Sequence, residues 1–458
     1  MNTKESFFLL GRALVIALAV FLFFSCDSGE KINDNPFEEI GTADLKVSYE
    51  YNADEVYLSW ELNGDEEFDA FHVYDALKKN DLTLGKTERA CTLSHIPYQK
   101  AVMITIELKK SGIIVSSTSV SVKTDGLDEE IKSILIPDKG GVTEGDGMYS
   151  VALPDGRSLF IFQDSYVGPV TNGQRSPSDH MYRNTFSIYD KGKMTAVYGP
   201  GNKSACIPPD SPNEWPYWYW PMDGFVVDNV LYIFHMKMYQ GEPGQWGFRF
   251  HSARMTEYSL PDITLVSDNA VPFEGSTDIH YGAAALNDGG TLYIYAQVDI
   301  DNTLNTVSQA MVARTTKEEL KTRWEYYTGS GWSEDASQAA YMSGLSDVAI
   351  SSQFNVFKLR NKYVLLSQSK IFDCGEIYTF VSSTPYGPWG NKKVIYSIAQ
   401  ENPNWFSYNA MVHPQFERKD MILVSYNMNT FVSGEQATNV ECYRPRFFWV
   451  PIDDVLNK

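Results

Sequence analysis

Basic charge is scarce in this sequence: 38 Lys and Arg residues stand against 58 Asp and Glu residues, for a formal net charge of −20. Proteins that bind nucleic acids need clustered Lys and Arg to release counterions from the phosphate backbone, and no such cluster occurs. Nucleic acid is therefore excluded as a partner, and neutral or cationic ligands fit better. The nucleophile elbow, the phosphate-binding loop, the dinucleotide fingerprint and the HExxH motif are also absent.

Cysteine is scarce as well, and its spacing carries no metal-binding pattern. Outside the N-terminal region the chain has Cys91, Cys206, Cys374 and Cys442, which form no CxxC pair and no zinc ligand pattern. Export would permit disulfides, but such irregular spacing favours isolated buried thiols. No cofactor is predicted; a structural calcium ion in a channel is conceivable, although the sequence shows no ligand set for it.

Long hydrophobic runs are missing, because the apolar stretch at 13–24 is shorter than the ~20 residues that a membrane span needs. Lys4 and Arg12 precede this stretch and Ser25 stands directly before Cys26, as in a secretory signal. The serine–cysteine step resembles the bacterial lipobox, and the "CDSGE" that follows resembles the surface-export signal of outer-membrane lipoproteins. The sequence thus predicts a signal peptide over 1–25 and a lipid anchor on Cys26, at the outer membrane or cell surface. A transmembrane anchor is the alternative.

What is present is a series of short strands. Residues 26–42 are polar with Asn, Pro and Gly breakers and predict a flexible tether. Over 43–125, several short alternating strands at regular spacing predict a small β-sandwich. Trp60 and the "FHVY" strand after it resemble the core of a fibronectin type III domain, and Tyr98 lies near the corner where that family has a tyrosine. Such a module would act as a spacer without catalysis.

A five-fold repeat occupies 134–458. Five hydrophobic strands follow turns rich in Asp, Asn and Gly, which are typical of tight hairpins because these turns require positive φ. The five are "LPDGRSLFIF", "VVDNVLYIF", "LNDGGTLYIY", "LRNKYVLL" and "ERKDMILV". A strand-rich unit repeated in this way is typical of a β-propeller. The predicted fold class is all-β, a fibronectin III-like β-sandwich followed by a five-bladed β-propeller; a large irregular sandwich is the alternative to the propeller.

Two carboxylates stand out in the first repeat. Asp146 precedes the turn at Asp155-Gly156 by about as many residues as Asp164 follows it. The two should therefore face each other across adjacent strands, where directly opposed Cβ atoms lie ~5 Å apart. Such proximity raises one pKa, which supplies the protonated and ionised carboxyls of glycoside hydrolysis. The alternative is that one of them caps a glycine-rich turn. Asp223, at the head of the next blade, is a third candidate acid that could tune the pair or be the true partner of Asp146.

Further candidates come from the same end of the other blades. The aromatic stretch "YWYWPMDGF" and its surroundings place Trp215, Trp218 and Trp220 near Asp223. Because the stretch does not alternate in polarity, we expect these rings to form a wall on which sugars stack, with an aromatic core between blades as the alternative. Substrate-binding candidates on the remaining blades are His280, Gln353, Asn409 and His413, although a lone histidine is more often structural.

Taken together, "GDGMYSVALPDGRSLFIFQDS", "WPMDGFVVDNVLYIF" and "YNAMVHP" with "LVSYN" resemble the five-bladed propeller glycosidases of the arabinanase and β-fructosidase group. The likeness is greatest to an uncharacterised bacterial family related to endo-D-arabinanases. This resemblance implies hydrolysis of a polysaccharide, with a furanoside such as arabinan as one candidate, by carboxylates placed here at Asp146, Asp164 and Asp223. The alternatives are a non-catalytic glycan-binding surface lipoprotein of a polysaccharide-utilisation system and a structural assembly protein.

Overall fold

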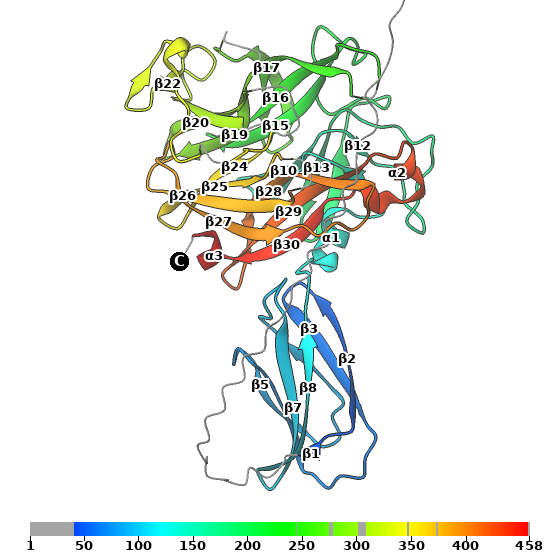
Figure 1. Cartoon of the computed structure of the whole chain (residues 1–458). Coiled ribbons are helices and arrows are strands. Elements are labelled where there is room, and N and C mark those ends of the chain that lie inside the picture. Colours follow the sequence, from blue (N-terminus) through cyan, green and yellow to red (C-terminus); the bar gives the residue numbers. More distant parts are fainter. Residues whose placement is uncertain are drawn as a thin grey trace, which may run out of the picture.

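The computed structural model describes residues 41–456 apart from 245, 274–277, 301–307, 346–347 and 372–373. The predicted signal peptide, Cys26 and nearly all of the predicted tether lie outside this range. Almost all regular structure is β, in a small lower body and a larger upper body (Figure 1). Within the described ranges, no helix has the length and apolarity of a membrane span.

The lower body is a β-sandwich, as predicted. One sheet has the order β2-β3-β6 and the other β1-β8-β7-β4-β5. The strands are β1 (Gly41–Thr42), β2 (Leu45–Asn52), β3 (Glu55–Leu62), β4 (Ala70–Asp75), β5 (Asp81–Gly85), β6 (Ala90–Leu93), β7 (Val102–Lys110) and β8 (Ile113–Val122). Alternate residues of β3 are buried, including Trp60, which packs edge-on against Phe71 in the core between the sheets. The likeness to fibronectin type III stays a prediction.

The upper body has five main sheets, one for each predicted repeat, and one short two-stranded sheet. Blade 1 has β10 (Tyr149–Ala152), β11 (Ser158–Phe162), β13 (Thr185–Asp190) and β14 (Lys193–Val197); blade 2 has β15 (Tyr217–Val227), β16 (Val230–Gln240), β17 (Phe248–Ser259) and β18 (Thr264–Ala270). Blade 3 has β19 (Ile279–Asp288), β20 (Thr291–Asp299), β21 (Ser308–Thr315), β22 (Glu325–Tyr327) and β23 (Trp332–Ser333). Blade 4 has β24 (Asn355–Leu359), β25 (Lys362–Gln368), β26 (Glu376–Ser382) and β27 (Gly390–Ser397); blade 5 has β28 (Trp405–Arg418), β29 (Met421–Thr430) and β30 (Arg446–Pro451).

The five sheets close into a ring. The first strands of successive blades touch in the order β10, β15, β19, β24 and β28, and β28 returns to β10. Apolar side chains fill the space between neighbouring blades, as in the cluster that joins Tyr149, Phe234 and Tyr281 of blades 1, 2 and 3. This closed order is that of a five-bladed β-propeller and rules out the irregular sandwich. The short pair β9 (Glu144–Gly145) and β12 (Ser165–Tyr166) extends blade 1 beyond its main sheet.

β-Bulges interrupt the inner strands of three blades at similar places. The register shifts between Pro221 and Gly224 in β15, between Tyr281 and Ala284 in β19, and between Tyr408 and Met411 in β28. Beyond their bulges, β15 and β28 continue with paired extensions, 217–221 and 405–408. Because β10 contacts both strands, these extensions form two walls on either side of blade 1.

Blade 5 is completed from outside the repeat. Its sheet has three strands in the described part of the chain, and the connector from the sandwich adds the bridge Leu127–Phe448 at its outer edge. The Asp128 backbone N–H donates to the Phe447 carbonyl at 2.8 Å, and the indole of Trp449 donates to the Asp128 carboxylate at 2.8 Å. Asp128 also caps α1 (Glu129–Leu135). The connector is thus part of the propeller.

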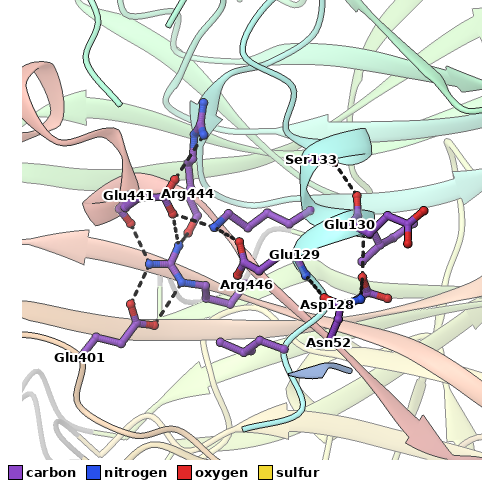
Figure 2. Close-up of polar contacts among 12 residues, drawn as sticks. Asn52, Asp128, Glu129, Glu130, Ser133, Glu401, Glu441, Arg444 and Arg446 are labelled. Carbon is purple, nitrogen blue, oxygen red and sulfur yellow. Dashed lines mark hydrogen bonds and ion pairs between the residues drawn. The ribbon is translucent and has the colours of Figure 1, made fainter. Parts of the chain in front are cut away.

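Ion pairs reinforce this connection. Figure 2 shows Arg446 of β30 held between Glu401 and Glu441, with distances to Glu401 of 3.1 and 2.8 Å. Lys132 of α1 reaches Glu441 at 2.8 Å, so the network ties the connector to η2 (Val440–Tyr443). The remaining short elements are η1 (Ala336–Gln338), α2 (Glu435–Thr438) and α3 (Ile452–Val455). Tyr98 lies in the loop between β6 and β7, where the chain passes from one sheet of the sandwich to the other, and donates its hydroxyl to the blade 4 carbonyl of Ile395 at 2.9 Å.

Candidate active site

Asp146 and Asp164 lie opposite each other between the main sheet of blade 1 and the short β9–β12 pair, as the hairpin register predicts. On one side of the pair, Gly145 of β9 is paired with Ser165 of β12. On the other side, Tyr149 of β10 is paired with Ile161 of β11, in the same register. At the pair itself, the Asp146 N–H donates to the Asp164 carbonyl at 3.2 Å, and the Gln163 N–H donates to the Asp146 carbonyl at 2.9 Å. The two carboxylates therefore start from facing positions on adjacent strands.

The Asp146 carboxyl has one strong donor. Tyr408, from the blade 5 wall, donates its hydroxyl to Oδ2 at 2.5 Å, and Asn429 donates to that hydroxyl at 3.3 Å. Oδ1 is buried and has no hydrogen-bond partner among the described residues. Burial and the charge of Asp164 raise the pKa of Asp146 to about 7, so much of it is protonated near neutral pH.

The Asp164 carboxylate has charged and neutral donors. The Trp220 indole of the blade 2 wall donates to Oδ1 at 2.9 Å, and the Arg183 guanidinium lies 3.4 and 3.3 Å from the two oxygens. Its side chain is 19% exposed. Burial raises the pKa of Asp164, while Arg183 and the indole oppose that rise by stabilising the carboxylate. The environments thus differ: at Asp146 a neighbouring negative charge adds to the effect of burial on the pKa, whereas at Asp164 a guanidinium and an indole N–H oppose that effect.

Three of these partners were not among the predicted residues. Tyr408 is the first residue of the "YNAMVHP" stretch, next to Asn409, but the β-bulge that follows it determines which face of the strand it occupies. Tyr443, in η2 between β29 and β30, donates its hydroxyl to the backbone carbonyl of Asp164 at 2.9 Å. Arg183 precedes β13, and no motif surrounds it.

Asp223 is not part of the acid pair's hydrogen-bond network in the described chain. It sits at the β15 bulge, where Oδ1 accepts from the Gly224 N–H at 2.8 Å and Oδ2 accepts from the Ala285 N–H of blade 3 at 2.9 Å. Burial raises its pKa to about 7. The geometry makes Asp223 a brace between blades 2 and 3, which differs from the catalytic position predicted for it.

The three tryptophans have different environments. Trp220 lies at the acid pair, where its ring meets Phe248 edge-on at 4.7 Å. Trp218 is 1% exposed and belongs to the core between blades, so the expectation of a sugar contact is wrong for this residue. Trp215 is 65% exposed in the loop before β15. The aromatic stretch is thus divided between core and surface.

The predicted polar ligands are mostly structural. His413 is 0% exposed, with Nδ1 2.8 Å from Ser150 Oγ and Nε2 2.9 Å from Ser425 Oγ, and burial lowers its pKa to about 3. It cannot reach a substrate, so the prediction for His413 is wrong. Gln353 is likewise buried.

Asn409, at the β28 bulge, accepts from the Ser351 hydroxyl. His280 of β19 packs against Phe250 with ring centroids 4.3 Å apart. The described residues contain no cluster of three or more His, Cys, Asp or Glu side chains suited to a metal ion.

The molecule is thus a five-bladed β-propeller with an N-terminal β-sandwich and an unequal acid pair at one end of its first blade. Residues 133–451 match the family described as a domain of unknown function (DUF5005), and the chain belongs to that family. No curated protein matches it.

Among solved structures, the chain is similar to a Bacteroides ovatus ATCC 8483 protein whose hydrolase activity is inferred, with 20% identity over 76% of this chain and 90% of that one and a TM-score of 0.60. This likeness supports the fold. More distant similarities are to a Bombyx mori GH32 β-fructofuranosidase (10% identity, 70% and 63% covered, TM-score 0.39). Another is to an exo-β-1,3-galactanase from Phanerochaete chrysosporium (10% identity, 68% and 61% covered, TM-score 0.38).

Proposed function

We propose that this protein is a glycoside hydrolase that uses the carboxyl groups of Asp146 and Asp164 to cleave a neutral polysaccharide. The observation that carries the proposal is the inequality of the pair: burial and a neighbouring charge favour a proton on Asp146, while Arg183 and Trp220 favour the charged form of Asp164. Glycoside hydrolysis requires one proton donor and one carboxylate at the scissile bond. Like charges on facing strand positions are destabilising, so a purely structural reason for the pair is lacking.

The proposed reaction assigns one role to each carboxyl group. Asp146 gives its proton to the glycosidic oxygen as the bond from that oxygen to the anomeric carbon breaks, and the leaving sugar departs as an alcohol. Asp164 attacks the anomeric carbon; water then cleaves the resulting ester, and its proton returns to Asp146. Facing Cβ atoms ~5 Å apart suit the carboxyl separation of ~5–5.5 Å in retaining enzymes.

The proposal extends to the class of substrate and to the location of the protein. The net charge of −20 favours a neutral glycan over an acidic one. The resemblance of the blade motifs to arabinanase-type propellers supports an arabinan-type furanoside. The lipobox-like Cys26 and its acidic flank support a lipid-anchored protein at the outer membrane or cell surface.

The test is incubation of the protein with D-arabinan, L-arabinan, levan and xylan, followed by chromatography of released sugars. Asp146→Asn and Asp164→Asn should each abolish release. Asp228→Asn, an equivalent change at an exposed ion pair with Lys317, should leave it unchanged. Retention of the configuration at the anomeric carbon, followed by NMR, tests the role of Asp164. Glycan retardation in affinity gels without any product would instead establish the non-catalytic glycan-binding protein.

A further inference from the structure

A continuous row of aromatic rings connects the two acids. From Asp164 the row runs through Trp220 to Phe248 (4.7 Å between ring centroids) and from Phe248 to Trp246 (6.3 Å). Trp246 contacts Phe406 at 6.4 Å, and Phe406 lies 5.6 Å from Tyr408. Tyr408 donates to Asp146, which completes the circuit. We call these five rings the aromatic arc.

The arc joins two blades that are not neighbours. Trp220 and Phe248 belong to blade 2, and Trp246 lies in the turn between β16 and β17, whereas Phe406 and Tyr408 belong to blade 5. Blade 1, which carries both acids, lies between these blades, with β10 against β15 on one side and β28 on the other. The contact between Trp246 and Phe406 therefore spans the gap between the two walls.

Hydrogen bonds and an ion pair join the two ends of the segment that carries Trp246. The backbone N–H groups of Gly241 and Glu242 both donate to the Gly247 carbonyl, at 2.9 and 3.0 Å, and Arg249 pairs with Glu242 at 2.7 Å. A Cβ on Gly247 would lie 2.0 Å from the Glu242 carbonyl oxygen, so only glycine fits there. These contacts hold together the end of β16 and the start of β17 on either side of Trp246.

Core packing does not explain the outer part of the arc. Trp246 is 54% exposed, and so is Phe431, which stacks on Phe406 with centroids 4.5 Å apart and planes at 27°. Large rings that group together in the open are characteristic of a ligand-binding surface. Here they surround the proposed acid pair, so the ligand they fit is the same glycan.

A bridge between the walls has a direct consequence for the substrate. Cleavage within a polymer requires a cleft that is open at both ends, so that the chain passes over the acids. A cleft closed on one side by touching rings accepts only the end of a chain. On the basis of the proposed function, we infer that the arc makes this enzyme act on chain ends, and that Trp246 and Phe406 set this specificity.

Binding stoichiometry tests this inference without turnover. The doubly inactive full chain, Asp146→Asn with Asp164→Asn, is titrated calorimetrically with D-arabinan, L-arabinan, levan and xylan, each as a long polymer and as a short oligosaccharide. One protein per chain at both lengths is expected. A number of bound proteins that rises with chain length would overturn the inference but leave the glycan site. Absence of binding to all four glycans would overturn the proposed function and the inference together.

Removal of the contact between Trp246 and Phe406 provides the second test. With the catalytic acids intact, we expect the wild type to release one small product from the start of the reaction. Trp246→Gly should yield a mixture of oligosaccharides and bind about fivefold more weakly. Tyr57→Ala, at an exposed ring on β3 of the sandwich, should retain the single product. A ladder of products from the wild type, or an unchanged product from Trp246→Gly that unfolds at the wild-type temperature, would refute the role of the arc.

Discussion

Because the pKa of Asp146 is raised, replacing Asp146 with a residue that cannot ionise should change the stability of the protein in a pH-dependent way. Burial and Asp164 raise this pKa from 3.8 to about 7, so the native protein holds the proton more tightly than the unfolded chain. The stabilisation is therefore complete below pH 4 and is lost as the pH rises through 7. The difference between the two pKa values corresponds to about 4 kcal/mol at most, of which about 3 kcal/mol is lost between pH 5 and pH 8.

Asp146→Asn removes this titration and keeps an oxygen that can accept from Tyr408. Relative to the wild type, the variant should gain about 3 kcal/mol in free energy of unfolding from pH 5 to pH 8. At about 2 °C per kcal/mol, the difference in Tm should grow by about 6 °C. Thermal unfolding followed by circular dichroism over this range measures it. Parallel curves for the two proteins would refute the reasoning, and Asp228→Asn serves as the control that should run parallel.

Three further outcomes are expected. Tyr408→Phe removes a hydrogen bond that favours the charged form of Asp146, so the alkaline limb of the kcat/KM profile should move up by about one pH unit. An unchanged alkaline limb would show that the Tyr408 hydroxyl does not influence the pKa of the proton donor. Arg446→Met leaves Glu401 without its bidentate partner and should cost about 3 kcal/mol in denaturant unfolding, where a loss below about 1 kcal/mol would show a weak network. Gly282→Ala places a Cβ 2.4 Å from a blade 2 phenylalanine at φ +104° and should lower Tm by more than any surface substitution; a wild-type Tm would contradict this.

The ring of blades could be predicted from the sequence because each blade begins with a local signal. A tight turn fixes the register of the hairpin that it closes, so Asp155 and Gly156 suffice to place Asp146 opposite Asp164. The outer edge of blade 5 gave no such signal. Its partner, the segment at Leu127, lies about 300 residues earlier in the chain, and a single bridge has no sequence pattern.

The site was predictable only within one blade. The partners of the acids come from other blades, Trp220 from blade 2 and Tyr408 from blade 5, and the relative height of two blades depends on packing that no local pattern records. Bulges add a second difficulty, because a one-residue shift reverses which side chains face the channel. For that reason Asp223, which the sequence places at the head of its blade but which lies at the β15 bulge, binds backbone N–H groups instead.

The sandwich takes part in the support of the site, beyond the role of a spacer. Its Ala53 N–H donates to the Leu127 carbonyl at 2.9 Å, and the Gln99 amide pairs with both backbone groups of Ser397 on the edge of blade 4. Exposed strand edges attract unwanted pairing, and here the sandwich and its connector cover them. Blade 5, whose edge is covered in this way, supplies Tyr408 and Tyr443 to the two acids. The acid pair thus receives two of its partners from a blade whose outer edge is completed by the connector from the sandwich.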